Sequence, residues 1–581
     1  MAGLQTRGDK LADPRLFGPA FLIATALVCS WFANQNLPTP DESANLAAAA
    51  KILDGKVFYR DIDAYPFPGS TYLLALWMAV FGESVGAARA LAALVFCGFA
   101  AALYASSLQL LERRSAALFA LSLLPFKFLG FPNFTAYLYS DIALAFAAIA
   151  IALFLRAGLG ASARALAGTG AAVGAAILCK QSTGLYLGLA MGLLILFPSV
   201  ALASSRDPFR ERLMRGSALA LGALAVTGPA LLYFAWEGLL GEMLYSGLVR
   251  PFTGYLPTSG VPFGPLLAWW QFGTLEGPAA QPYFPLRYSE MLYAKMLPNI
   301  AESSTYWRIG EVMARALYSS IPIVFILWCW RRFRASRTHD ASHSPLFVFS
   351  ILALSVVASA FPRADYSHII NVYPVFLLAM FALAEVAPRA RLSRRAILSQ
   401  AAIVSSLFVL VGIQARWYDR ALTYPLELER ASLRVKPQDA WVGAVVSHIR
   451  EHTPEGEALF VYGHEAYFYF LSDRYFPWRF LQLYPGMAGG DDGEALARTL
   501  IENRPRFVAK GLVRWPGMPT LSRYTPVLAT TIFQNYEETA AWHTRGVQPP
   551  SKSIFALFES AGSGADPVEV PGNSPGADNL R

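Results

Sequence analysis

Long runs of apolar residues, separated by short polar connections, occupy most of the first 415 residues of the chain. A helix that crosses a membrane needs about 20 mostly apolar residues, and runs of this length recur along the chain. The pattern predicts a polytopic α-helical membrane protein with about 11 transmembrane helices. The expected spans lie near residues 16–35, 85–111, 115–132, 141–157, 165–181, 183–201, 216–236, 313–330, 344–362, 368–387 and 396–415.

Basic residues cluster in the short connections that follow every second expected span. Together with the basic N-terminus, all clusters fall on one side of the membrane, and the positive-inside rule makes that side cytoplasmic. We therefore expect a cytoplasmic N-terminus, with the first apolar run as an uncleaved anchor, and a C-terminus on the outer side. The clusters are Arg113-Arg114; Arg156 and Arg164; Arg206, Arg210, Arg212 and Arg215; Arg331, Arg332, Arg334 and Arg337; and Arg389, Arg391, Arg394 and Arg395.

Two long connections, residues 37–84 and 237–311, lie on the outer side in this topology. In the first outer loop, the Ala-rich stretch 42–53 predicts a helix. The apolar stretch 69–82 is short for a span and predicts a helix lying in the membrane interface. The second outer loop is rich in Pro, Gly and aromatic residues, and its stretch 288–297 predicts another interfacial helix.

The composition changes to that of a soluble protein from about residue 416. Helix and strand patterns alternate there, which predicts a soluble α/β domain over 416–560 behind a transmembrane domain over 1–415. Residues 561–581 are rich in Gly, Ser, Pro and Asp, and we expect them to be disordered. Helices are expected at 442–453 and 494–503, and strands at 458–463, 506–511, 529–539 and 553–560.

The overall composition supports the membrane assignment and argues against nucleic acid as a partner. Hydrophobic residues make up 55% of the chain and charged residues 15%, below the roughly 25% of soluble domains. The net charge of +8 arises from clusters at the expected membrane surface, and no nucleic-acid motif accompanies it. The four cysteines lie inside apolar runs without metal-ligand spacing, which is typical of packing residues.

Charged residues from distant parts of the chain approach the outer face in this topology. The pair Asp41-Glu42 follows the first span closely, and carboxylates so near a membrane are costly unless they face water, a cation or a substrate. The other members are Arg60, Asp61 and Asp63 in the first outer loop, Asp141 at the start of the fourth span, Lys180 at the outer end of the fifth, and Arg363 and His368 between the ninth and tenth.

Each of these residues also has a purely structural explanation. The acidic residues are placed to cap helices or to form turns. The basic residues are placed to extend into the headgroup region or to anchor a loop, and the histidine to pack under the tail domain. Their common side of the membrane favours a shared site.

Such a combination of charges suits the transfer of a sugar from a polyprenyl phosphate. The lipid of this donor lies in the bilayer, and its phosphate lies at the outer interface. Basic residues can stabilise the phosphate leaving group, while a carboxylate removes the proton from an acceptor hydroxyl. The donor needs no nucleotide, which agrees with the lack of a Gly-rich phosphate loop in the sequence.

The first outer loop resembles that of the C-type membrane glycosyltransferases. It is most similar to family 39, the group of protein O-mannosyltransferases and the lipid A aminoarabinose transferase. These relatives carry an acidic pair after span 1, a helix ending in an Asp-Gly-like turn, a Tyr-Pro-Pro-like segment and an apolar helix ending in Phe-Gly. Here the matching residues are Asp41-Glu42, Ile52-Leu53-Asp54-Gly55, Tyr65-Pro66-Phe67-Pro68 and Phe81-Gly82, with further similar segments at 179–188, 361–374 and 458–474.

The resemblance implies a C-type glycosyltransferase fold and a role for each charged residue. Asp41 becomes the candidate base, Glu42 its partner, and Asp141 the acidic residue of the second outer loop of the family. Phe67 departs from the family pattern by separating the two prolines, so the turn geometry there is left open. The candidates for donor and phosphate binding are Arg60, Lys180, Arg363 and His368, with Asp61 and Asp63 as supporting acidic residues.

The resemblance further implies an inverting enzyme of the bacterial inner membrane, with the C-terminal domain in the periplasm. Its donor would be a polyprenyl-phosphate sugar, and its acceptor a periplasmic glycan, lipid A, envelope polysaccharide or protein. Relatives differ in their need for a divalent cation, so a metal is neither expected nor excluded. A transporter or flippase for a lipid-linked sugar is the main alternative, and a non-catalytic scaffold is the second.

Overall fold

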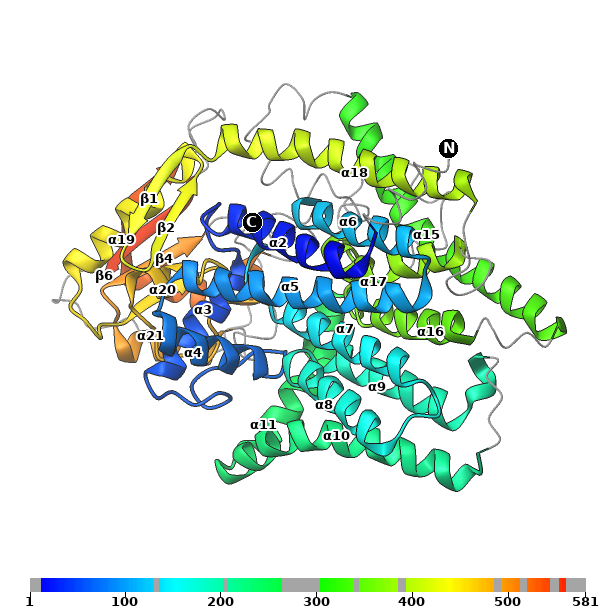
Figure 1. The fold of residues 1–581 in the computed structure, drawn as a ribbon. Coiled ribbons are helices and arrows are strands. Elements are labelled where there is room, and N and C mark those ends of the chain that lie inside the picture. Colours follow the sequence, from blue (N-terminus) through cyan, green and yellow to red (C-terminus); the bar gives the residue numbers. More distant parts are fainter. Residues whose placement is uncertain are drawn as a thin grey trace.

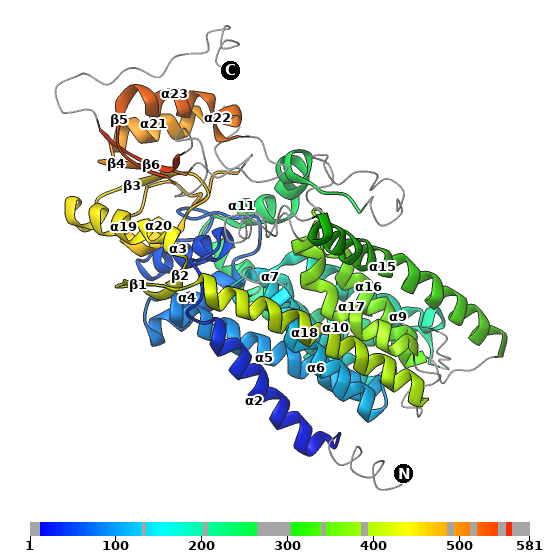
Figure 2. The ribbon, with the colours of Figure 1, turned by 90° about the horizontal axis from the view of Figure 1, so that it is seen from above.

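The computed structural model describes residues 12–129, 135–201, 207–263, 304–338, 344–384, 393–484, 493–511, 520–543 and 553–560. Long helices form a bundle, and the C-terminal strands lie at one end of it beside α3 and α4 (Figures 1 and 2). The helices up to residue 421 are α2 (Pro14–Phe32), α3 (Pro40–Leu53), α4 (Gly69–Phe81), α5 (Val85–Leu110), α6 (Arg113–Leu129), α7 (Tyr139–Ala157), α8 (Ala163–Cys179), α9 (Gln181–Leu196), α10 (Phe209–Trp236), α11 (Leu240–Leu244), α12 (Leu256–Ser259), α15 (Ser304–Thr338), α16 (Ser344–Ala358), α17 (Tyr366–Ala384) and α18 (Arg394–Ala421).

Each expected span coincides with one helix of the bundle, which identifies a multi-pass membrane protein. By length and composition, five helices among the described residues are long and apolar enough to cross a membrane. The exact number of spans and the orientation of the termini stay predictions. The five segments are Pro14–Phe32, Val85–Leu110, Tyr139–Ala157, Phe209–Trp236 and Tyr366–Leu383.

Glycines bring α8 and α10 into close contact. A Cβ atom on Gly170 of α8 would lie 2.0 Å from the carbonyl oxygen of Leu219, and one on Gly222 of α10 would lie 2.0 Å from that of Ala167. Small residues allow helix backbones to approach in a membrane, where helix association depends on close packing. Alanine at either glycine would therefore push the two helices apart.

The first outer loop contains the two expected helices. The Ala-rich stretch forms α3, whose Leu46, Ala47 and Ala49 are fully buried. The apolar stretch forms α4, which ends before Gly82 at a φ of 90°. The expected interfacial helix at 288–297 lies outside the described residues.

The second outer loop continues from α11 into two π-helical segments, η3 (Tyr245–Val249) and η4 (Pro251–Tyr255). Val261, which follows α12 in this loop, pairs with the connection between α16 and α17. The Val261 N–H donates to the Pro362 carbonyl at 3.1 Å, and the Ala364 N–H donates to the Val261 carbonyl at 2.8 Å. This pairing brings the second outer loop beside the expected basic site around residue 363.

The C-terminal region has an α/β structure. The four-stranded sheet has the order β3-β4-β6-β5, in which β3 and β4 are parallel and the other neighbours antiparallel. Figure 2 shows α21, α22 and α23 on one side of this sheet and α19 and α20 on the other. The elements are α19 (Trp441–His452), β3 (Leu459–Tyr462), α20 (Tyr467–Ser472), α21 (Glu494–Asn503), β4 (Phe507–Gly511), α22 (Leu521–Tyr524), α23 (Pro526–Asn535), β5 (Tyr536–His543) and β6 (Ser553–Ser560).

One expected strand, 529–539, is only partly correct. Residues up to Asn535 belong to α23, and the strand begins at Tyr536. Pro526 occupies the first turn, where its missing N–H costs nothing, and Leu528 and Ile532 bury one helical face. The Thr530 and Thr531 hydroxyls donate to carbonyls one turn back, so these residues fit a helix despite their β propensity.

An antiparallel hairpin, β1 (Tyr424–Leu428) and β2 (Ala431–Val435), joins the C-terminal region to the bundle. The Arg434 carbonyl accepts from the Asn36 N–H at 2.8 Å, and the Arg434 N–H donates to the Asn34 carbonyl at 2.6 Å. The side chain of Arg430 pairs with Glu83 at 3.1 Å. Because these contacts lie at both ends of the first outer loop, the C-terminal region is fixed against that loop.

Candidate functional site

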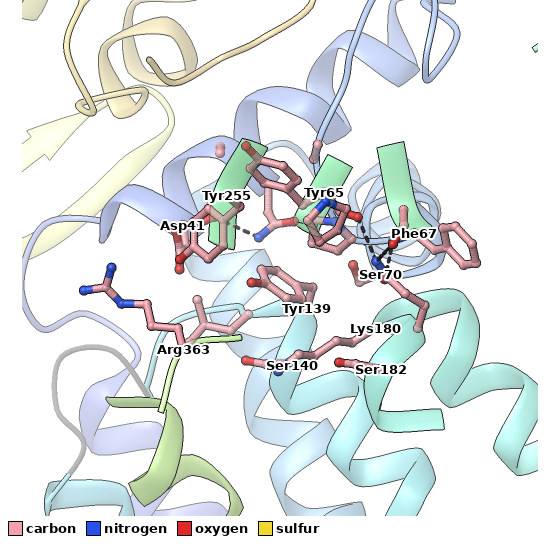
Figure 3. A pocket seen from close by; sticks show the side chains of 18 of the residues that line it. Asp41, Tyr65, Phe67, Ser70, Tyr139, Ser140, Lys180, Ser182, Tyr255 and Arg363 are labelled. Atoms are coloured by element: carbon pink, nitrogen blue, oxygen red, sulfur yellow. Dashed lines mark hydrogen bonds between the residues drawn. The ribbon is translucent and has the colours of Figure 1, made fainter. Parts of the chain in front are cut away.

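A cavity of about 390 Å³ opens where the outer loops, the ends of several bundle helices and the C-terminal region meet (Figure 3). Its wall includes the start of α3, the segment around Tyr65, the start of α7 and the α8–α9 junction. The η3–η4 segment, the connection before α17 and residues 481–484 complete it. Of the residues predicted to form the site, Asp41, Asp63, Lys180, Arg363 and His368 line this cavity.

Asp41 lies in the first turn of α3. Its side chain is accessible, and it lines the cavity. Within the described ranges, its carboxylate has no hydrogen-bond or ion-pair partner. Burial among protein atoms raises the pKa of Asp41 above its ordinary value, while the nearby His368 and Arg363 lower it. An unpartnered carboxylate with a raised pKa is suited to accept a proton.

Glu42 turns away from the cavity, although it is adjacent to Asp41 in the sequence. Its two carboxylate oxygens accept from Nε and an Nη of Arg89 at 3.0 and 2.9 Å, and both side chains are buried. The Tyr137 N–H donates to the same carboxylate at 3.2 Å. Glu42 thus ties the start of α3 to α5 and α7, which places it behind Asp41 and away from any bound substrate.

The Arg363 and His368 side chains meet on one buried carboxylate, that of Asp365. Arg363 Nε donates to Asp365 Oδ2, and His368 Nδ1 lies 2.6 Å from Oδ1. Burial alone would raise the pKa of Asp365, but His368 and Arg363 hold it below its usual range. The Asp365 carboxylate also accepts from the His368 N–H, so it caps the start of α17. The result is a fixed cluster with net positive charge when His368 is protonated.

Lys180 is the single residue between α8 and α9, and its extended backbone interrupts an otherwise helical run. This break places its side chain in the cavity. In the part of the chain that the structure describes, the Lys180 ammonium has no hydrogen-bond or ion-pair partner. In the view of Figure 3, the Tyr139 ring appears between Asp41 and Lys180, and all three side chains line the same cavity.

Asp63 forms a buried ion pair with Arg250 of the second outer loop. The Arg250 guanidinium donates to both oxygens of Asp63, at 2.7 and 3.0 Å, and Ser246 donates at 3.2 Å. The same guanidinium lies over the rings of Tyr65 and Phe480, at 4.8 and 5.0 Å. Asp63 therefore joins both outer loops to the C-terminal region, and among the described residues that line the cavity Asp41 is the carboxylate without a partner.

Besides Glu42, three predicted site residues do not line the main cavity. Arg60 is half exposed and pairs with Glu237 at 2.8 Å. The Asp61 carboxylate accepts from the Val57 N–H at 2.8 Å and closes a turn. Asp141 lines a separate cavity of about 40 Å³ between α5, α7 and α17.

Phe67, which departs from the family pattern, is buried between η3 and the α8–α9 junction. A Cβ atom on Gly247 would lie 2.2 Å from its ring, so only glycine fits there. The Gln181 amide nitrogen donates to the carbonyls of Tyr65 and Gly247, at 3.0 and 2.5 Å. Gln181 therefore fixes the turn around Phe67 against η3.

Several residues of the site were not singled out by the sequence. Tyr139, Tyr255 and Tyr484 line the cavity, and Tyr255 is hydrogen-bonded to Arg363. Burial raises the pKa of Tyr255 to about 12, so its hydroxyl stays protonated. Arg89 could have been singled out from the sequence. It is the one charged residue in the expected span 85–111, and a charged residue inside a span requires a partner.

The described residues contain no group of three or more His, Cys, Asp or Glu side chains arranged to hold a metal ion. Asp365 is already bound by Arg363 and His368, and Asp63 by Arg250.

The sequence comparisons identify one related family. Residues 65–233 match the model of a family described as dolichyl-phosphate-mannose-protein mannosyltransferase. The matched segment includes Lys180 and the Tyr-Pro-Phe-Pro turn, and it ends before Arg363. No curated protein matches the chain.

The fold is shared with solved membrane enzymes. ArnT from Cupriavidus metallidurans, in a crystal structure with undecaprenyl phosphate, superposes with a TM-score of 0.50 at 14% identity, covering 94% of this chain and 99% of that one. Its apo structure gives 0.50 at 12% identity, with 94% and 98% covered. The oligosaccharyltransferase AglB from Archaeoglobus fulgidus is less similar, with a TM-score of 0.45 at 12% identity and 93% and 76% covered. Residues 65–233 are thus similar to this mannosyltransferase family, and the fold of the chain is similar to that of the membrane enzyme ArnT.

Proposed function

We propose that the protein transfers a sugar from a polyprenyl-phosphate donor to a hydroxyl group of an acceptor on the outer side of the membrane. The observation that carries this proposal is the Asp41 carboxylate, which has no partner among the described residues and shares one cavity with the Lys180 ammonium, which has none there either. A base and a cation in one cavity suit the two ends of a displacement reaction.

The reaction is a single displacement at the anomeric carbon of the donor sugar. Asp41 takes the proton of the acceptor hydroxyl as its oxygen forms a bond to that carbon. The bond from the carbon to the phosphate oxygen breaks, and the polyprenyl phosphate leaves with the electron pair. Lys180 stabilises the negative charge that develops on the phosphate. One displacement inverts the configuration of the sugar.

Arg363 and His368 act differently from Lys180, because both are already bound to Asp365. Burial raises the pKa of Asp41, and the positive charge of this cluster near Asp41 opposes that rise. It also attracts the phosphate of the donor into the cavity. Asp365 fixes both side chains and so sets the position of this charge.

A polyprenyl phosphate as donor agrees with the apolar side of the cavity. Leu185, Leu248 and Phe252 line the cavity and are also exposed at the surface of the molecule. An isoprenoid chain in the bilayer could pack against these residues while its phosphate reaches Lys180. The description of the matched family names a dolichyl-phosphate sugar, and the similar structure of ArnT contains undecaprenyl phosphate. Both observations support this class of donor.

We place the protein in the bacterial inner membrane, with its N-terminus in the cytoplasm and its C-terminal region in the periplasm. The basic connections between the expected spans support this orientation. The acceptor would then be a periplasmic glycan, lipid or protein with a free hydroxyl group.

The placement of the charged residues favours a transferase over a transporter. Lys180 and Arg363 come from connections between helices, and Asp41 comes from the first outer loop. A transporter is expected to hold its charged residues near the middle of the membrane, on broken helices.

The direct test uses the full-length protein in lipid nanodiscs with a panel of undecaprenyl-phosphate hexoses and pentoses. Transfer should convert one donor into undecaprenyl phosphate and a glycosylated acceptor from an outer-membrane lipid and periplasmic extract, both detected by mass spectrometry. The variant Glu455→Gln, which alters an exposed carboxylate of the C-terminal region, should behave as the wild type. Movement of intact donors across liposome membranes without any transfer would instead support the transporter.

A further inference from the structure

The C-terminal region supplies one wall of the cavity through the segment 481–484. Leu481, Gln482 and Tyr484 all line the cavity. The segment is held in place from its other side: the Leu483 N–H donates to the Gly463 carbonyl at 3.2 Å, and the Tyr524 hydroxyl donates to the Leu483 carbonyl. This wall is therefore fixed before any substrate binds.

Gln482 connects the wall to the candidate base. Its amide nitrogen donates to the Pro40 carbonyl at 2.6 Å and lies 3.4 Å from the His464 carbonyl. Pro40 directly precedes Asp41 in the first turn of α3. The position of the wall is thus coupled to the position of the Asp41 carboxylate.

Tyr484 contributes an uncharged aromatic residue to the cavity wall. Its ring stacks on that of His464, with centroids 4.5 Å apart and an interplanar angle of 24°. Burial lowers the pKa of His464 to about 4, so the imidazole is neutral at neutral pH. Burial, followed by the charge of Asp41, raises the pKa of Tyr484 well above its usual value, so the phenol is neutral as well. Tyr484 lies close enough to Asp41 and Arg363 for both charges to act on its phenol.

An acceptor hydroxyl must reach Asp41, and the groups beside Asp41 therefore contact the acceptor. A pyranose ring has a flat face of C–H groups and a rim of hydroxyls, which suits an aromatic face beside hydrogen-bonding groups. A seryl or threonyl side chain carries only a methylene or methyl group and would leave most of the Tyr484 ring uncovered. The neutral stack offers no countercharge to a charged peptide or headgroup.

We propose that the acceptor of this enzyme is a carbohydrate, and that its sugar ring packs against Tyr484, which His464 holds in place. This inference rests on the proposed glycosyltransferase function and adds the acceptor class and a specificity-determining residue. Tyr484 selects the acceptor, while Lys180, which also lines the cavity, binds the phosphate of the donor.

The test measures acceptor binding separately from transfer. The full-length protein in nanodiscs, loaded with undecaprenyl phosphate, is titrated with methyl α-mannoside and methyl β-glucoside and followed by saturation-transfer NMR. We expect saturation of the sugar C–H protons in the wild type and in Tyr484→Phe, and binding weakened about fivefold or more in Tyr484→Leu, which keeps apolar bulk without the ring. Tyr424→Leu is the matched control, because Tyr424 lies exposed on β1 and should retain full binding.

Three results would overturn the proposal. They are unchanged sugar binding in a folded Tyr484→Leu variant, no sugar binding in the wild type, and Tyr484-dependent binding of an N-acetyl-threonine amide peptide but of no glycoside. Folding of each variant is checked by its melting temperature. If Tyr484→Leu is unstable, His464→Ala is used instead, because it removes the ring on which Tyr484 stacks. Undecaprenyl-phosphate affinity is measured in parallel. Loss of this affinity would count against the donor site. Retained undecaprenyl-phosphate affinity together with failed sugar binding would count only against Tyr484 as the acceptor-binding residue.

Discussion

The guanidinium of Arg89 holds both carboxylate oxygens of Glu42, at 3.0 and 2.9 Å, inside the protein. This pair separates the roles of two neighbouring acidic residues. Glu42 is fully engaged in fixing the first turn of α3, and Asp41 is left facing the cavity without a partner in the described ranges. The two neighbouring carboxylates thus have different environments: that of Glu42 is buried in an ion pair, and that of Asp41 faces the cavity.

The Glu42–Arg89 pair should contribute strongly to stability. Removing one partner of a buried ion pair leaves the other charge unpaired, at a cost of about 3–5 kcal/mol. We expect Glu42→Gln to lower the melting temperature of the protein in nanodiscs clearly. The matched control is Glu237→Gln, which removes the exposed partner of Arg60 and should cost about 0–1 kcal/mol. Equal melting temperatures for the two variants would contradict the structural role of Glu42.

Arg250 should hold the η3–η4 segment at the cavity. Its bidentate contact with Asp63 is buried, so Arg250→Met should free the segment and increase hydrogen exchange in residues 245–255. Arg479→Met is the control, since Arg479 is partly exposed and its Nε lies 3.7 Å from the Asp63 carboxylate. Hydrogen exchange in Arg250→Met that matches the control would show that the segment is held by other contacts.

Lys180 should bind the phosphate of the donor. A hydrogen bond to a charged group is worth about 1.5–3 kcal/mol, so Lys180→Ala should weaken undecaprenyl-phosphate binding by about tenfold or more. The control Lys56→Ala changes an exposed lysine of the first outer loop and should leave the affinity unchanged. An affinity of Lys180→Ala within twofold of the wild type would remove Lys180 from the donor site.

The rate of transfer should depend on pH through Asp41. Burial raises its pKa, and a base acts only when it is deprotonated. The rate at saturating substrates should therefore fall as the pH drops through this raised pKa, with an acid limb above the ordinary aspartate value of about 4. Asp365 titrates below its usual range, so the Arg363–His368 cluster keeps its carboxylate charged across the limb. An acid limb that persists in the residual activity of Asp41→Asn would have to be assigned to another group.

The helices of the bundle could be predicted from the sequence because the length of an apolar run is a local property. Each expected span coincides with a helix, and the Ala-rich stretch forms α3 as expected. The strand expected at 529–539 was partly wrong, because two β-branched threonines there donate to helical carbonyls after Pro526. Local propensity was ambiguous at that point, and burial of Leu528 and Ile532 decided it.

The pairing of the site residues could not be predicted in the same way. Asp63 and Arg250 are 187 positions apart, and nothing near either residue indicates the other. The wall formed by Gln482 and Tyr484 likewise depends on how the C-terminal region docks on α3. The common side of Asp41, Lys180 and Arg363 was predicted, since it follows from the charge pattern alone, whereas their separate partners depend on the tertiary structure.

The most direct measurement of the central claim is the single-turnover rate of Asp41→Asn with a loaded polyprenyl-phosphate donor. The amide has the size of the carboxylate but cannot take the proton, so we expect the rate to fall by about 10²- to 10⁴-fold. Undecaprenyl-phosphate affinity and melting temperature should stay close to those of the wild type, because Asp41 has no partner to lose in the described ranges. A near-normal rate in a folded, donor-binding Asp41→Asn variant would contradict the assignment of Asp41 as the base.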